Sequence, residues 1–84
     1  MKYIVVKDSV YTNTEKIFVF PDSEMHSEFY SSIKGEYNTF LISAGFVGFD
    51  DEGKIYCYGN SISLNKYSRK EDTVLLKREL SKRN

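Results

Sequence analysis

The sequence predicts a single α+β domain in two layers, a four-stranded, mainly antiparallel sheet with both helices on one face. Two segments of helical periodicity each follow a pair of short segments rich in β-branched and aromatic residues, which gives the order β-β-α-β-β-α. No glycine-rich phosphate loop joins a strand to a helix, which disfavours a doubly wound parallel sheet. With 84 residues, the whole chain 1–84 is expected to form one small domain.

The first hairpin is predicted to join residues 3–7 (YIVVK) to residues 16–20 (KIFVF). The second of these segments carries apolar side chains at consecutive positions, so both of its faces can be covered or one can expose phenylalanine. Pro21 is expected to end it, because proline cannot donate to a strand ladder.

A first amphipathic helix is predicted after Asp22 and Ser23, which are typical N-cap residues, with its end at Gly35. Apolar residues recur there every four positions, which places them on one face of a helix. That stripe consists of Met25, Phe29 and Ile33.

The second hairpin is predicted over residues 41–49 and 54–59, joined by the acidic turn 50–53. Gly53 supplies the positive φ that such tight turns need. Glycine inside a strand marks a bulge or a close approach of other atoms, so Gly45 and Gly48 indicate a bent strand or a face left bare for a ligand.

The last helix is predicted over residues 69–81, with Ser68 as N-cap and Glu71 completing a capping box. Residues 82–84 are expected to fray. Leu76 and Leu80 lie on its apolar stripe, and we expect both to be buried together with the stripe of the first helix.

The polar segment 60–67 is predicted to be ordered. Ile62 and Leu64 are two residues apart, so in an extended chain they point the same way and close one end of the core. Ser61 and Ser63 would then face the other side and hydrogen-bond nearby backbone.

Residues that could carry catalysis are few. His26 is the only histidine and Cys57 the only cysteine, which is too few for a conventional zinc site. We interpret His26 as a partly buried or surface histidine and Cys57 as a small buried hydrophobe. The sequence therefore predicts a protein that is not an enzyme and that has no metal or cofactor.

The charges are unevenly distributed although the net charge is zero. From Lys66 onward, seven basic residues stand against three acidic ones, so this segment carries +4 and the rest of the chain −4. Basic residues in the last turns of a helix complement its dipole, and they can also form a basic face for an acidic partner. Both interpretations stay open.

Three fragments occur together: SAGFV at 43–47, CYG at 57–59 followed by Ser61, Ser63 and Leu64, and Ser68-Arg69 with Asp72. In these fragments the chain resembles a group of short, uncharacterised proteins from bacteria, phages and other mobile elements. The resemblance covers roughly residues 40–76 and implies a small cytoplasmic or phage-encoded accessory protein, without implying a function.

We expect a small binding module, with an unknown protein partner or a second copy of itself. The alternative is a binder of nucleic acid or an anionic ligand that uses the basic last helix and the loop before it, since helix starts bind anions. No segment approaches the length of a membrane span, so the protein is expected to be cytoplasmic. The expected contact residues are Ser61, Ser63, Asn65, Ser68, Arg69 and Lys70.

Overall fold

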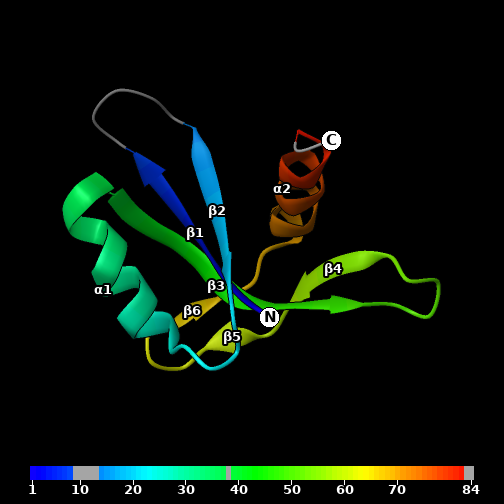
Figure 1. Cartoon of the computed structure of the whole chain (residues 1–84), viewed down its shortest axis with the longest axis horizontal. Helices are drawn as coiled ribbons and strands as arrows, with labels where there is room; N and C mark the ends of the chain where they lie inside the picture. The colour runs from blue at the N-terminus through cyan, green and yellow to red at the C-terminus, as the bar shows by residue number, and fades with distance from the viewer. Residues whose placement is uncertain (9–13, 38, 83–84) are drawn as a thin grey trace.

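The computed structural model describes residues 1–8, 14–37 and 39–82 and confirms the α+β class (Figure 1). Two short strands that the sequence did not predict, β5 and β6, stand between the second hairpin and the last helix. The elements are β1 (Lys2–Asp8), β2 (Glu15–Phe20), α1 (His26–Tyr37), β3 (Thr39–Phe49), β4 (Ile55–Tyr58), β5 (Asn60–Ser61), β6 (Lys66–Tyr67) and α2 (Lys70–Ser81).

The main sheet has the predicted four strands, in the order β2-β1-β3-β4, and every neighbouring pair is antiparallel. Val5 is opposite Ser43 and Val6 is opposite Leu41, so one extra residue of β3, Ile42, forms a β-bulge. A bulge bends its strand and increases the local twist.

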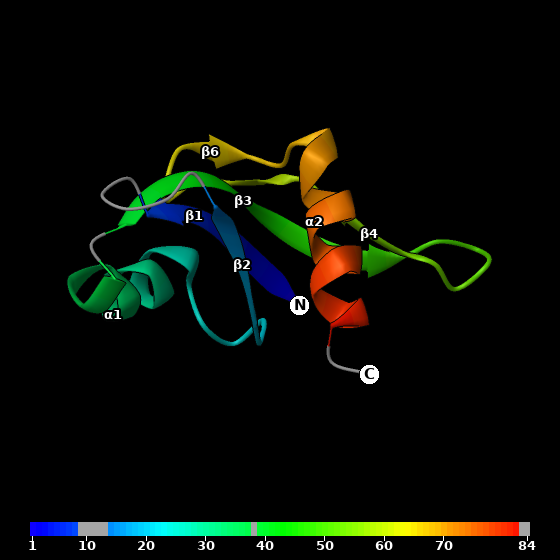
Figure 2. The ribbon, with the colours of Figure 1, turned by 90° about the horizontal axis from the view of Figure 1, so that it is seen from above.

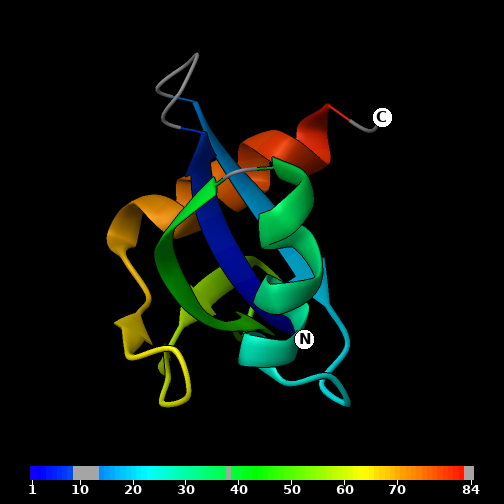
Figure 3. The same cartoon turned by 90° about the vertical axis from the view of Figure 1, so that its left-hand side faces the viewer.

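The bend allows α2 to contact both edge strands, β2 and β4. In a flat four-stranded sheet these edges would be roughly 14 Å apart, which is more than the width of one helix. The sheet therefore curves around α2, as Figure 3 shows.

The two helices lie on opposite faces of the sheet, so the prediction of both helices on one face is wrong. In Figure 3, β1 passes between α1 and α2. Tyr3 and Val5 belong to the core on the α2 side, whereas Ile4 and Val6 belong to the core on the α1 side. All four are essentially inaccessible to solvent, and a central strand that is apolar on both faces needs cover on both.

The core on the α1 side is rich in aromatic rings. Phe20 and Phe29 stack in parallel with their centroids 4.3 Å apart. The ring of His26 stands edge-on between Phe20 and Phe46, at 5.5 and 5.4 Å. These rings join α1 to the strands below it.

The predicted apolar stripes are confirmed only in part. Leu76 is buried, and Phe29 and Ile33 are partly buried against the α1-side core. Met25 and Leu80, however, are 50% and 39% exposed, so the prediction for these two is wrong.

The reason for the Met25 error is the start of α1. The helix begins at His26, and the Met25 carbonyl accepts the first helical hydrogen bond, from the Phe29 N–H at 3.0 Å. Met25 thus precedes the helix, and His26 occupies the buried position. The end also differs, since α1 continues past Gly35 to Tyr37.

The second hairpin is confirmed, and Figure 2 shows its turn projecting past α2. The carboxylate of Asp50 accepts the N–H groups of Glu52 and Lys54, each at 2.9 Å, and Gly53 has a φ of 79°. Gly45 lies at a close approach, because an added Cβ would be 2.5 Å from the carbonyl oxygen of Tyr58.

The segment 60–67 forms a short hairpin, and its side chains point differently from the prediction. β5 and β6 pair across a turn at residues 62–65, in which Asn65 has a φ of 54°. Alternation does not hold in a turn, so Ile62 is 90% exposed while Ser61 is buried. Only Leu64 packs against the core, on the α1 side.

The start of α2 is shifted by one residue from the prediction. Arg69, not Ser68, is the N-cap, and the carboxylate that accepts its backbone N–H at 2.9 Å belongs to Asp72, not Glu71. At the other end α2 ends at Ser81, and the Lys82 N–H donates to the Arg78 carbonyl; the fraying of residues 82–84 stays a prediction. For residues 83–84 it lies outside the described residues.

Candidate functional site

The six expected contact residues fall into two groups. Ser61, Ser63 and Asn65 lie in the β5–β6 hairpin, where the hydroxyls of Ser61 and Ser63 are 3.3 Å apart. The Ser61 hydroxyl also accepts the N–H of Leu64 at 3.3 Å. These polar groups therefore stabilise their own turn.

The second group, at the start of α2, is similarly engaged. The Ser68 N–H donates to the Gly59 carbonyl at 2.9 Å, and the Arg69 side chain is held by carboxylates. Lys70 is exposed. Within the described ranges, no hydrogen bond or ion pair joins these residues to the serines of the hairpin.

Arg69 is the centre of an ionic network. Its guanidinium makes two hydrogen bonds to the carboxylate of Glu15 on β2, at 2.8 and 3.1 Å, and one from Nε to Asp72 at 2.9 Å. Asp72 is completely buried, and its second oxygen accepts the Tyr3 hydroxyl at 2.6 Å. The network thereby joins β1, β2 and α2.

The pKa values follow from these contacts. The hydrogen bond from Arg69 lowers the pKa of Glu15, and the same bond raises the pKa of Arg69. Burial, and then the hydrogen bond to Asp72, raise the pKa of the Tyr3 phenol well above its ordinary value. All three groups thus keep their charge state at neutral pH, which is typical of a structural network rather than a proton-transfer site.

His26 and Cys57 are also engaged structurally. The Nε2 of His26 lies 2.8 Å from the carbonyl oxygen of Gly45 and must donate, because a carbonyl can only accept. His26 is also only 5% exposed, which is more buried than we expected. Burial raises the pKa of the Cys57 thiol to about 11, which keeps it protonated and a poor nucleophile.

The part of the chain that the structure describes contains no cluster of three or more side chains suited to hold a metal ion. None of its helices is long and apolar enough to cross a membrane.

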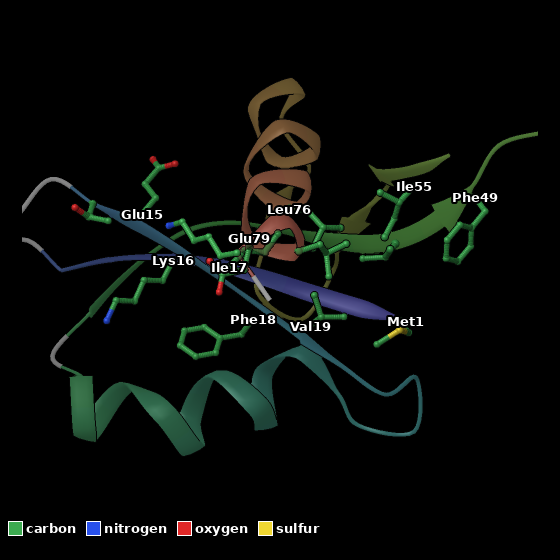
Figure 4. A pocket seen from close by; sticks show the side chains of 14 residues that line it. Met1, Glu15, Lys16, Ile17, Phe18, Val19, Phe49, Ile55, Leu76 and Glu79 are labelled. Carbon is green, nitrogen blue, oxygen red and sulfur yellow. The ribbon is translucent and has the colours of Figure 1, made fainter. Parts of the chain in front are cut away.

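A concave feature lies between the edge strand β2 and the C-terminal half of α2 (Figure 4). We name it the β2–α2 groove, and its volume is about 630 Å³. The groove is lined by residues 14–19, by Met1, Val47, Phe49 and Ile55, and by Leu76, Glu79, Leu80 and Lys82 of the α2 end.

The floor of the β2–α2 groove is the α2-side core itself. Ile17, Val47 and Leu76 lie at its bottom and are buried. At its rim Phe49 is 68% exposed and Met1 57% exposed. Because α2 covers only part of the curved sheet, the apolar core continues to the surface here.

A smaller recess of about 380 Å³ adjoins the groove where β2 begins. It shares Thr14, Glu15 and the end of α2 with the groove and adds two further side chains, Leu75 and Arg78. The apolar groove therefore has a charged end.

Sequence reasoning missed this groove. Its lining comes from both ends of the chain and from the middle, and no local pattern joins Met1, Phe49 and Leu80. The one available signal was the second strand segment, KIFVF, which is apolar on both faces.

No protein-family model, curated protein or solved structure matches this chain.

Proposed function

We propose that this protein is a non-enzymatic binding module that receives apolar side chains of a partner protein in the β2–α2 groove. The observation that supports the proposal is an open groove whose floor is the hydrophobic core and whose rim exposes Phe49, Met1 and Leu80. Large apolar groups gathered around a concavity mark binding surfaces. A cytoplasmic accessory role, as the resembled group implies, is part of the same proposal.

A polypeptide fits the groove better than a small molecule. Small-molecule sites bury most of the ligand surface, typically 70–90%. The rim residues Phe49 and Met1 are more than half exposed, so a small molecule here would stay largely in solvent. A protein segment can instead cover the rim with its own flanking residues.

The second candidate function, binding of nucleic acid or another anionic ligand, is favoured by the exposed basic side chains on α2. Lys70, Lys77, Arg78 and Lys82 are exposed, whereas Arg69 is occupied by Glu15 and Asp72. A gel shift with mixed DNA and RNA at low salt tests it, because phosphate contacts are strongest there. Absence of a shift would exclude this candidate.

A random-peptide display selection tests the first candidate. The wild-type protein is used to enrich peptides, whose affinities are then measured against Phe49→Ser, Leu80→Ser and the control Ile62→Ser. All three positions are exposed, so none of the substitutions should disturb the core.

We expect the groove variants to bind the enriched peptides at least about tenfold more weakly, since a buried apolar contact contributes about 1.5–3 kcal/mol. The control should bind as wild type does. No enrichment, or equal affinity for all three variants, would contradict the proposal.

A further inference from the structure

The β2–α2 groove follows the outer edge of β2. Six consecutive residues, 14–19, line it. Neighbouring side chains of a strand point to opposite faces, and here Ile17 packs on the α2 side while Phe18 packs on the α1 side. A groove that touches both kinds of side chain along most of the strand runs beside the strand edge.

The hydrogen-bond pattern shows which backbone groups face this edge. The Met1 carbonyl accepts the Val47 N–H at 2.8 Å, so the odd-numbered residues at the start of β1 bond toward β3. The even-numbered residues of β1 therefore bond toward β2, where Ile4 is paired with Phe18. Consequently Ile17 and Val19 point their N–H and C=O groups outward, into the groove.

The two edges of the sheet differ in whether their outward backbone groups have hydrogen-bond partners. At the β4 edge, the outward N–H of Cys57 donates to the Thr73 hydroxyl on α2 at 2.9 Å. Among the described residues, the outward backbone groups of Ile17 and Val19 have no such partner. An open strand edge beside an apolar groove is the arrangement that adds an extended peptide strand.

The charges at the groove end favour an acidic occupant. Arg78 and Lys82 are exposed, and neither forms an ion pair among the described residues. The groove and the recess together are lined by three basic side chains, Lys16, Arg78 and Lys82, and by two acidic ones, Glu79 and the Arg69-paired Glu15. Three basic against two acidic side chains give this combined lining a net charge of +1, and the exposed cations Arg78 and Lys82 lie at the groove end.

We propose that an extended segment of a partner protein, apolar at every second residue and acidic at one end, adds as a fifth strand to the edge of β2. Its apolar side chains enter the β2–α2 groove, and its acidic end meets Arg78 and Lys82. This inference rests on the proposed function and names the chemistry of the partner.

Synthetic peptides test it. The probes are DDEVTVTVT and TVTVTVEDD, which place the acidic end at either terminus because strand addition can run in either direction. Their counterparts carry lysine in place of each acidic residue. We expect the better acidic probe to bind at least tenfold more tightly than its lysine counterpart at low salt.

Backbone N-methylation separates strand addition from other binding. Successive amides of a strand point to opposite sides, so methylating either all valines or all threonines blocks only one set. We expect one methylated probe to lose at least tenfold in affinity and the other to stay within about twofold. Saturating probe should slow amide exchange at Ile17 and Val19 at least tenfold.

Charge reversal gives a matched pair of variants. Arg78→Glu should lower the affinity for the acidic probe at least fivefold and raise the affinity for the lysine probe. Lys77→Glu reverses an exposed neighbour that lines neither the groove nor the recess, and should change either affinity less than about twofold.

Strand addition would be overturned, but not the proposed function, by one result with display-selected peptides. They would bind in the groove, tolerate N-methylation at either set of alternate residues, and leave amide exchange at Ile17 and Val19 unchanged. Equal affinity for acidic and lysine probes would overturn the charge assignment. If both amides are protected in the protein without peptide, and sedimentation shows a dimer, the occupant is a second copy and the proposed partner segment is overturned. No groove-dependent peptide in the display selection would remove the proposed function as well.

Discussion

Replacing Arg69 by methionine tests whether this residue is structural, as its contacts indicate, or a ligand contact, as the sequence predicts. Methionine keeps the length of the side chain and removes the guanidinium. Asp72 is 0% exposed, and among the residues that the structure describes it would keep only the Tyr3 hydroxyl and one backbone N–H as donors. Removing one partner of a buried ion pair costs about 3–5 kcal/mol.

The Glu15 half of the network should contribute less. Glu15 and Arg69 are each about a quarter to a third exposed, and exposed ion pairs contribute only about 0–1 kcal/mol. We therefore expect a total loss of about 3 kcal/mol in the free energy of unfolding, most of it from Asp72. For a domain of this size that loss lowers the thermal midpoint by about 12–24 °C.

Urea and thermal unfolding followed by circular dichroism measure the effect. Lys70→Met removes the neighbouring cation, which is exposed, and should change the free energy of unfolding by less than about 0.5 kcal/mol. The same small change for Arg69→Met would refute the structural role of the network.

The dependence on pH gives a second test of the same substitution. Because the pKa of Glu15 is lowered in the folded protein, its stabilisation is present above the ordinary pKa of glutamate, about 4.3, and is lost as the pH falls through the lower folded value. Arg69→Met removes the cause of the lowered pKa. The variant should therefore lose less stability than wild type on acidification below about pH 5, and parallel curves would contradict this.

Three further predictions concern stability and reactivity. Leu76→Ala should lower the free energy of unfolding by about 2–5 kcal/mol in chemical denaturation, because Leu76 is 2% exposed. A loss below about 1 kcal/mol would contradict the packing of α2 on the sheet through this residue. Gly45→Ala should destabilise by about 1–3 kcal/mol, because the added Cβ approaches a backbone carbonyl oxygen. Gly53→Ala meets no heavy atom within 4 Å and should cost about 1–2 kcal/mol through its positive φ alone. Cys57, with a thiol pKa of about 11, should react with iodoacetamide at pH 7.5 at least about tenfold more slowly in the native protein than in urea; equal rates would contradict the burial.

Local chemistry predicts the hairpins well. The acidic turn ending at Gly53 fixes the second hairpin, and the structure uses both the carboxylate of Asp50 and the positive φ of Gly53. Helix starts are less certain, since several neighbouring residues can cap. His26 and Arg69 begin or cap their helices because contacts with Gly45, Glu15 and Asp72 select that position.

The face that each helix covers is not encoded locally. The periodicity of α1 and α2 shows that each has an apolar side, but not that the two helices cover opposite faces of one sheet. That depends on β1, whose four consecutive side chains from Tyr3 to Val6 are all buried, on alternating faces. The sequence did contain this signal, as a strand with apolar residues at consecutive positions.

The groove depends on still longer-range geometry. The bulge at Ile42 curves the sheet, and the contact of Tyr3 with Asp72 fixes the start of α2 over it. The far end of α2 then leaves part of the concave face uncovered. A site that forms because a helix covers a sheet incompletely has no sequence motif. The sequence therefore predicted contacts at the serines and at Arg69 instead.

Mapping of a bound peptide by amide chemical shifts tests the central claim most directly. The labelled protein is titrated with the tightest display-selected peptide, and shift changes are assigned along the chain. We predict that the largest changes fall on β2, on Phe49 and on the last two turns of α2. Changes concentrated instead on residues 61–70, the contact region that the sequence predicts, would contradict the assignment of the β2–α2 groove as the binding site.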